Sequence, residues 1–169
     1  MRVLVLLLVV GLTVFLFINR DRVKELEALG YPGVFLVSLL ANATLILPVP
    51  GVLFTSAMGA VFNPYLVALA AGTGATLGEL TGYMAGFSGQ GVIENRKWYD
   101  KVTSWMTKYG GITVLVLAFI PNPVFDIAGM VAGALRMPMW KYLIFSWIGK
   151  VGKMLLFALG GAELFNLFL

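Results

Sequence analysis

The chain has 169 residues, of which 60% are hydrophobic and 12% are charged, and its mean hydropathy is +0.93. An ordinary soluble domain has about 25% charged residues, whereas residues 28–78 contain no Asp, Glu, Lys or Arg at all. In a soluble protein, a segment of this length would reach the surface and would carry charged residues there. The sequence therefore indicates an integral membrane protein with a single membrane domain over residues 1–169.

Two residue types are missing, since the chain has no His and no Cys. Their absence excludes imidazole acid–base chemistry, thiol nucleophiles and nearly all zinc, haem and iron–sulfur ligation. No serine lies in a G-x-S-x-G elbow. The net charge of +4 comes without a long basic run, so nucleic acid is not an expected partner. We expect no enzymatic activity, no metal and no cofactor.

The first segment, residues 1–19, is predicted to be a membrane-anchoring helix. Its uncharged part is slightly short for the roughly 20 residues of a transmembrane helix. A signal peptide is the alternative, but residues 17–22 offer no small-residue cleavage site. Residues 19–30 are charged and carry apolar residues at helical spacing, which predicts a short helix at the membrane interface.

Two prolines interrupt the next apolar segment, Gly33–Phe62. Pro48 and Pro50 cannot continue a helix. The arms on either side, residues 33–47 and 52–62, are each too short to cross about 30 Å of hydrocarbon at about 1.5 Å per residue. We therefore expect a re-entrant hairpin. A single proline-kinked transmembrane helix is the alternative.

A full transmembrane helix is predicted over Tyr65–Phe87. Pro64 is favourable in the first turn of a helix, and the segment is long enough to span with some tilt. Glycines at four-residue spacing lie on one face and allow another helix to approach closely: Gly74, Gly78, Gly82 and Gly86. This glycine stripe packs against either the last helix or another subunit, so a homo-oligomer stays open.

The second half of the chain repeats this order of elements. Residues 88–108 predict an amphipathic surface helix with interfacial tryptophans. Residues 110–135 form a second apolar segment, and a last helix is predicted over residues 139–169. The second apolar segment is broken at its centre by three residues: Pro121, Asn122 and Pro123.

Ordered matches between the two halves indicate an internal repeat. The matches, at offsets of 74 and 73 residues, are Pro64 with Pro138, Glu79 with Lys153, Gly86 with Gly160, and the pair Pro48 and Pro50 with Pro121 and Pro123. Each unit contributes one full crossing, so the second unit should lie upside down, as in many transporters. The predicted fold is an all-α polytopic membrane protein. It has an anchor helix followed by two inverted units (residues 20–88 and 89–169), each a re-entrant hairpin plus a transmembrane helix.

Charged residues fall within or beside the predicted spans of both units: Glu79, Asp126, Lys150 and Lys153. An unpaired charge at this depth costs roughly 3 kcal/mol on insertion scales, so we expect pairing, with Glu79 bound to Lys153. One interpretation is a structural salt bridge between the units. The other is a polar path for a lipid headgroup, with lysines near the phosphate and an acid able to take up a proton.

The half-helices that follow Pro50 and Pro123 would begin near mid-membrane. Free N–H groups and the positive end of the helix dipole attract anions there. Asn42 and Asn122 could add donors to a bound phosphate. The alternative is that water and neighbouring side chains satisfy these groups.

Three short motifs point to a known family. They are Leu47-Pro48-Val49-Pro50-Gly51, the segment from Gly78-Glu79 to Gly82-Tyr83 and Gly86, and Phe119-Ile120-Pro121 with Pro123, Gly129 and Gly133. Together these motifs resemble the DedA proteins, also called the VTT-domain or SNARE-associated superfamily. The resemblance covers residues 30–161.

Membership would imply two facing re-entrant hairpins and a role in moving lipids between leaflets. Bacterial members are linked to undecaprenyl phosphate or phosphatidylethanolamine, often with proton coupling, and eukaryotic relatives are scramblases. Many bacterial members carry an acid where this chain has Val52, and arginines where it has Ala118 and residues 124–126. Lys150 and Lys153 could supply the positive charge instead.

These observations predict a lipid translocator, a flippase or scramblase that acts without ATP and with proton coupling allowed. Its partners would be membrane lipids, either phospholipid or polyprenyl phosphate, and its location the inner membrane of a prokaryotic cell. Two alternatives remain open at this point. One is a non-transporting membrane scaffold or assembly protein that binds its partner through the glycine stripe. The other is an ion-coupled carrier of a small anion.

Overall fold

The computed structural model describes residues 27–43, 51–89, 96–121 and 124–167. Every regular element in these ranges is an α-helix, as the sequence predicts. The predicted anchor helix, Pro48, Pro50, Asn122 and Pro123 lie outside the described residues. The helices are α3 (Glu27–Ala43), α4 (Gly51–Val61), α5 (Pro64–Gly78), α6 (Leu80–Phe87), α7 (Arg96–Tyr109), α8 (Gly111–Phe119), α9 (Phe125–Ala134) and α10 (Met139–Leu167).

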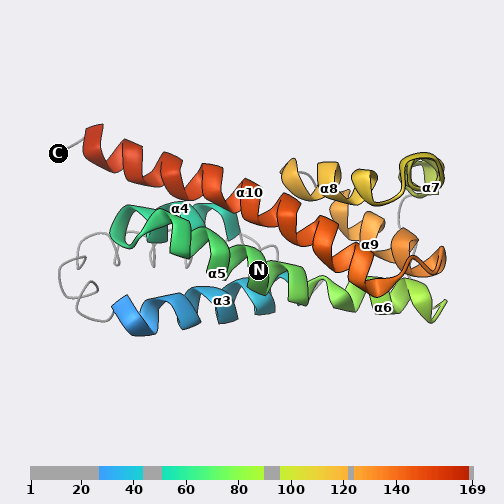
Figure 1. The fold of residues 1–169 in the computed structure, drawn as a ribbon, viewed down its shortest axis with the longest axis horizontal. Coiled ribbons are helices and arrows are strands. Elements are labelled where there is room, and N and C mark those ends of the chain that lie inside the picture. Colours follow the sequence, from blue (N-terminus) through green and yellow to red (C-terminus); the bar gives the residue numbers. More distant parts are fainter. Residues whose placement is uncertain (1–26, 44–50, 90–95, 122–123, 168–169) are drawn as a thin grey trace.

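The longest of these helices, α10, connects the two ends of the molecule (Figure 1). It runs along the body and contacts α4, α5 and α8. Around its C-terminal half lie α3, α4 and α5, with α3 packed on α5. Around its N-terminal half, α6 packs on α9, and α7 and α8 lie beside α9. Short helices therefore surround a long one at both ends.

The predicted span over Tyr65–Phe87 is present as two helices in line, α5 and α6, with Glu79 between them. The backbone there stays right-handed, and the N–H groups of Glu79 and Tyr83 both keep their bonds to the carbonyl four residues back, at 3.2 Å. The hydroxyl of Thr81 donates to the Gly78 carbonyl and so competes with the helical ladder. The structure therefore differs from the predicted uninterrupted helix at one residue, Glu79.

The start of the first apolar arm also differs from expectation. We expected an interfacial helix to end at Gly30 and a separate arm to begin at Gly33. Instead α3 continues through both positions and contains Pro32. Packing explains the difference, because the Tyr31 ring lies 5.7 Å from the Phe62 ring and a side chain at Gly30 would collide with that same ring. These contacts pack the first turns of α3 against Phe62, which follows the end of α4.

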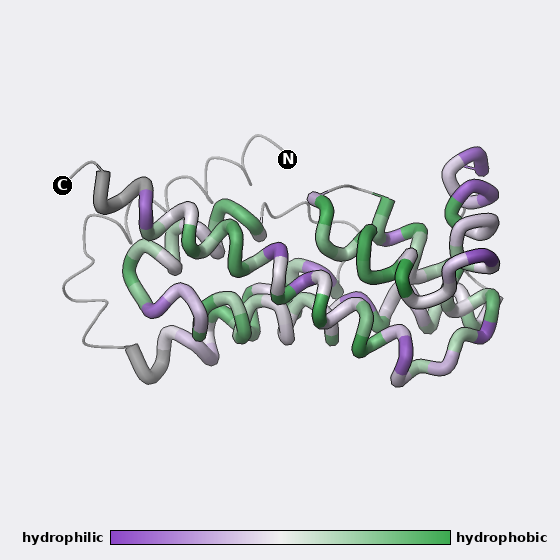
Figure 2. Tube along the Cα trace, turned by 45° about the horizontal axis from the view of Figure 1, so that its top comes forward, coloured by the Kyte–Doolittle hydropathy of each residue, from purple (hydrophilic) through white to green (hydrophobic). Residues whose placement is uncertain are grey.

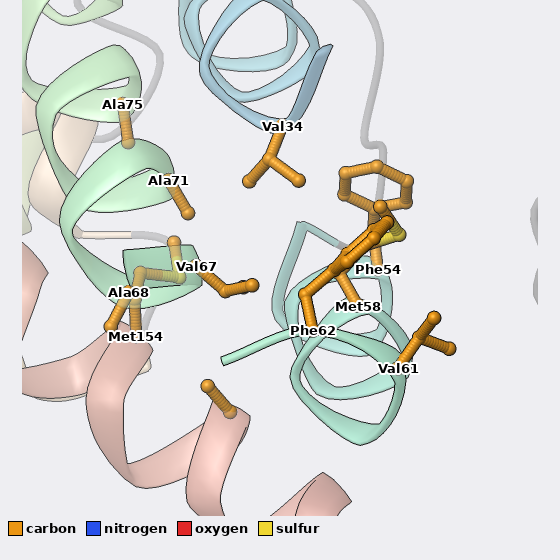
Figure 3. Packing of buried hydrophobic residues seen from close by; sticks show 11 residues of the cluster. Val34, Phe54, Met58, Val61, Phe62, Val67, Ala68, Ala71, Ala75 and Met154 are labelled. Atoms are coloured by element: carbon orange, nitrogen blue, oxygen red, sulfur yellow. The ribbon is translucent and has the colours of Figure 1, made fainter. Parts of the chain in front are cut away.

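Two apolar clusters fill the interior of the described residues. In the first, Val34 of α3 and Val67 of α5 point toward a common centre with side chains of α4 (Figure 3). The second lies among α6, α7, α8, α9 and α10. From α10, Met154 belongs to the first cluster and Tyr142 to the second. Lys150 lies between them on the same helix.

The amphipathic helix predicted in the middle of the chain is confirmed as α7. Its apolar face buries Val102 and Met106. Lys101 is exposed on the opposite side, and its Nζ lies 5.0 Å from the ring centres of both Trp98 and Trp105. Hydrophilic residues recur along α7 in Figure 2, in contrast to the apolar helices beside it. This pattern is typical of a helix at a membrane interface.

Among the described helices, length and composition identify one that could cross a membrane, over Met139–Glu163 of α10 with a mean hydropathy of 1.5. Shorter apolar helices accompany it: Gly30–Ala43, Gly51–Val61 and Phe125–Ala134. Large apolar side chains are exposed around the body, among them Leu36, Leu40, Leu53, Leu66, Trp140 and Leu156. So many exposed apolar residues are unusual for a soluble monomer and agree with a membrane protein.

The start of α5 allows a first test of the fold. The Asn63 side-chain oxygen accepts hydrogen bonds from the N–H groups of Tyr65 and Leu66, at 3.0 and 3.4 Å. We expect Asn63→Ala to lower the free energy of unfolding by about 1 kcal/mol, since two donors lose their acceptor. Asn63→Ser is the control because serine also caps helices. A thermal-unfolding midpoint lowered equally by both substitutions would contradict this assignment.

Candidate functional site

A buried lysine lies at the junction of the two ends of the molecule. Lys150 of α10 is only 2% exposed. Its Nζ donates to Glu79 Oε1 at 2.6 Å and to Asn42 Oδ1 at 2.8 Å. It also lies 4.7 Å from the ring centre of Phe125. One ammonium group thus joins α10 to α3, to the α5–α6 junction and to α9.

The bonding around this lysine compensates for its removal from water. Glu79 is 5% exposed, so both partners of the ion pair are desolvated. A buried pair is tolerated only when its geometry is good and further groups satisfy the remaining donors and acceptors. The amide oxygen of Asn42 and the face of the Phe125 ring provide these further contacts. The pair is therefore a well-satisfied polar centre inside an apolar molecule.

Local packing brings Asn42 to this centre. Gly74 and Gly78 let α5 approach α3 so closely that an added Cβ would meet the backbone of Phe35 or Leu39. The amide of Asn42 is oriented by its own helix, because its Nδ2 donates to the Ser38 carbonyl at 2.8 Å. Its oxygen is then left for the lysine. We expected Asn42 to donate to an anion, but in the structure its oxygen serves a cation.

The expected pairing of Glu79 with Lys153 is wrong, because Glu79 binds Lys150. The two lysines are three residues apart, which rotates one relative to the other by about 60° around the helix axis. Lys150 faces the α5–α6 junction, whereas Lys153 is half-buried beside it. Lys153 remains near enough to interact electrostatically with Glu79 and Asp126.

Asp126 lies in the first turn of α9 and is exposed. It interacts electrostatically with Lys150 and Lys153. All four charged residues singled out from the sequence therefore belong to one neighbourhood. Glu79 and Lys150 are bonded, and the other two lie within electrostatic range of that pair.

The predicted proline breaks add less to this site than the four charged residues do. Pro121 is exposed and follows the end of α8, and the other residues of the breaks fall outside the described part of the chain. The helices that follow the two breaks are α4 and α9. Anion binding at their N-terminal ends stays a prediction.

The glycine stripe packs inside the chain. Gly74 and Gly78 face α3, and a side chain at Gly86 would collide with the Met130 backbone of α9. Gly82 has more room, because the nearest atom to an added Cβ is the Asp126 carbonyl oxygen at 3.8 Å. Of the two partners expected for the stripe, the last helix is not the one found. The stripe contacts α3 and α9 instead.

Two polar residues near the ion pair were missed from the sequence. Tyr142 and Ser146 are fully buried, and they precede Lys150 on α10 at four-residue spacing. That spacing places all three on one helix face. The signal was therefore present in the sequence, although hydroxyl groups in an apolar helix attract less attention than charges.

A groove lies near this buried face, along α6. It has a volume of about 570 Å³. Its lining residues are Thr81, Tyr83, Met84, Ala85, Phe87, Ser88 and Met139. The Tyr83 hydroxyl donates to the Met137 carbonyl at 2.6 Å, and its ring stacks on Tyr142 with centres 5.1 Å apart.

Comparison with known proteins identifies the family of the chain. The VTT domain matches residues 49–163, which cover most of the described helices. The chain is 31% identical over 128 residues to the inner membrane protein YqaA of Escherichia coli, covering 73% of this chain and 85% of YqaA. No solved structure matches the chain.

Other matches are to eukaryotic proteins and cover a smaller part of the chain. The chain is 32% identical over 91 residues to vacuole membrane protein KMS2 of Arabidopsis thaliana, covering 52% of this chain. A vacuole membrane protein 1 homologue of Dictyostelium discoideum is 39% identical over 51 residues, covering 30% of this chain. The matched regions span only 21% and 13% of these two relatives.

Proposed function

This chain belongs to the VTT-domain family of membrane proteins, which includes the DedA proteins, and from that premise we propose that it moves lipids between the two leaflets of its membrane. The observation that carries the proposal is the buried Lys150–Glu79 pair at the junction of the helices. Ionisable residues inside a membrane are rare and commonly mark the path of a substrate or ion.

The chemistry of the pair suits a phospholipid or polyprenyl phosphate headgroup. An incoming phosphate can compete with Glu79 for the ammonium of Lys150, and the half-buried Lys153 adds a second positive charge nearby. Glu79 would then be free to bind the lipid amine or to take up a proton. No nucleotide-binding motif occurs in the sequence, so a gradient or simple equilibration would drive the movement.

The proposal includes the inverted repeat of two re-entrant hairpins. Helix contacts at matching positions support it. A side chain at Gly59 of α4 would meet the Ala158 backbone of α10, and one at Gly133 of α9 would meet the Tyr83 backbone of α6. Gly59 and Gly133 are 74 residues apart, the offset of the sequence repeat. In such folds the two half-helices enclose a shared interior, which gives a headgroup somewhere to pass.

Reconstitution into lipid vesicles tests the function. In vesicles that contain the wild-type chain, we expect external dithionite to bleach more than the half of the fluorescent lipid that lies in the outer leaflet. With the variant Glu79→Gln/Lys150→Met, we expect dithionite to bleach only that half. The matched control is Lys141→Met, which removes an exposed lysine from the same helix. Excess bleaching that is unchanged in the double variant would contradict a lipid path through the pair. Bleaching no greater than in empty vesicles, for both phospholipid and polyprenyl phosphate probes, would favour a membrane scaffold. The prokaryotic inner membrane is the proposed location.

A further inference from the structure

Two buried hydroxyl groups have no hydrogen-bond partner among the residues that the structure describes. They are Tyr142 Oη and Ser146 Oγ, both on α10 and both on fully buried side chains. A buried polar group without a partner costs about 1–3 kcal/mol, so such groups are rare and call for an explanation. Two of them, one helical turn apart, form a polar surface rather than an isolated defect.

The position of these hydroxyls connects two features already described. On one side lies the Lys150–Glu79 pair, one turn beyond Ser146 on the same face of α10. On the other side, Tyr142 stacks on Tyr83, which lines the groove of about 570 Å³. The unpartnered hydroxyls thus occupy the interval between an open groove and a buried ion pair.

The hydroxyl group of Tyr142 lies close to the backbone of α9. The neighbouring residue on α9 is Gly129, where an added Cβ would come within 3.0 Å of Tyr142 Oη. Buried water typically makes about three hydrogen bonds to otherwise unsatisfied polar groups. Tyr142 and Ser146 offer such groups along one line.

We propose that the buried face of α10 holds a chain of water molecules, bound by Tyr142 and Ser146, that connects the groove beside Tyr83 with the Glu79–Lys150 pair. The groups facing Glu79 are Lys150 and Lys153 of α10, Asp126 of α9 and Asn42 of α3. Water is the ligand, and the passage gives the carboxylate of Glu79 access to one side of the membrane. The use of this access in transport rests on the proposed function, whereas the hydration itself is measurable without transport.

Radiolytic hydroxyl-radical labelling of the wild-type chain in lipid nanodiscs tests for the water directly. We expect Tyr142 to be oxidised at a rate comparable to that of the exposed Tyr109, because radicals form from water held beside it. Phe62 is the internal control, a buried aromatic ring in the apolar cluster. Oxidation of Tyr142 as slow as that of Phe62 would overturn the proposal.

Substituted cysteines test whether the water is continuous with the outside, and the absence of native cysteine leaves no background. We expect Ser146→Cys to react with a small thiosulfonate about tenfold or more faster than Ala158→Cys, a fully buried position on the same helix, since only the hydrated thiolate reacts. Slow labelling of Ser146→Cys with fast oxidation of Tyr142 would overturn the connected passage and leave isolated buried water. If Ser146→Cys does not fold, slow oxidation of Tyr142 in the wild-type chain still overturns the proposal, and Tyr142→Cys takes the place of Ser146→Cys in the test of continuity. If the wild-type chain is hydrated at Tyr142 and Ser146 but moves no lipid, the proposed function is rejected and the water passage is retained.

Discussion

Replacing Lys150 with methionine should strongly destabilise the protein, by about 3–5 kcal/mol, because it leaves the Glu79 carboxylate buried without its partner. The loss includes the bond from Nζ to Asn42 and the contact with the Phe125 ring, so α3 and α9 lose their common attachment to α10. We expect a lower thermal-unfolding midpoint in detergent and a smaller folded fraction on size exclusion.

The double variant Glu79→Gln/Lys150→Met is the informative comparison. It removes both charges together, and replacing a whole buried pair is often neutral or stabilising. We therefore expect the double variant to recover most of the stability that Lys150→Met loses, while lipid movement stays absent. Lys153→Met should cost less than Lys150→Met, since Lys153 is half-buried and is not the partner of Glu79. Equal losses for the two lysines would contradict the pairing.

The sequence predicts which residues form the charged centre, but it does not predict which of them bind each other. Glu79, Asp126, Lys150 and Lys153 stand out because charges are rare in apolar segments. Which lysine binds Glu79 depends on the rotation of α10 against α5 and α6, and periodicity alone does not determine that rotation. The match at the repeat offset favoured Lys153, but spatial packing selects Lys150.

The helical segments themselves follow closely from proline and glycine positions. Pro64 begins α5, and the second broken segment gives the two short helices α8 and α9. The irregularity at Glu79 could not be predicted, because it affects one residue whose backbone stays right-handed within an otherwise regular helix. The partner of the glycine stripe was also undetermined, since four small residues permit close approach by any helix.

Substituting Gly133 with alanine should disrupt the α6–α9 contact. The new Cβ would collide with the Tyr83 carbonyl and would lie 2.6 Å from the Phe87 N atom. Both are backbone atoms, which cannot move aside as a flexible side chain can. Overpacking typically costs about 1–3 kcal/mol, and more where the backbone must shift. We expect a lower thermal midpoint and a reduced yield of folded protein.

Gly82→Ala is the matched control on the same interface, because its Cβ would have 3.8 Å to its nearest neighbour. Alanine is favoured over glycine in a helix by about 1 kcal/mol, so this variant should keep or raise the thermal midpoint. If the stripe served only to bind another copy of the chain, Gly82→Ala and Gly133→Ala would leave the monomer equally stable and change only its association. The stability of the two monomers is measured at a dilution where association is absent. Unequal stability would place the contact within one chain. In that chain α9 packs against α6, which follows Glu79.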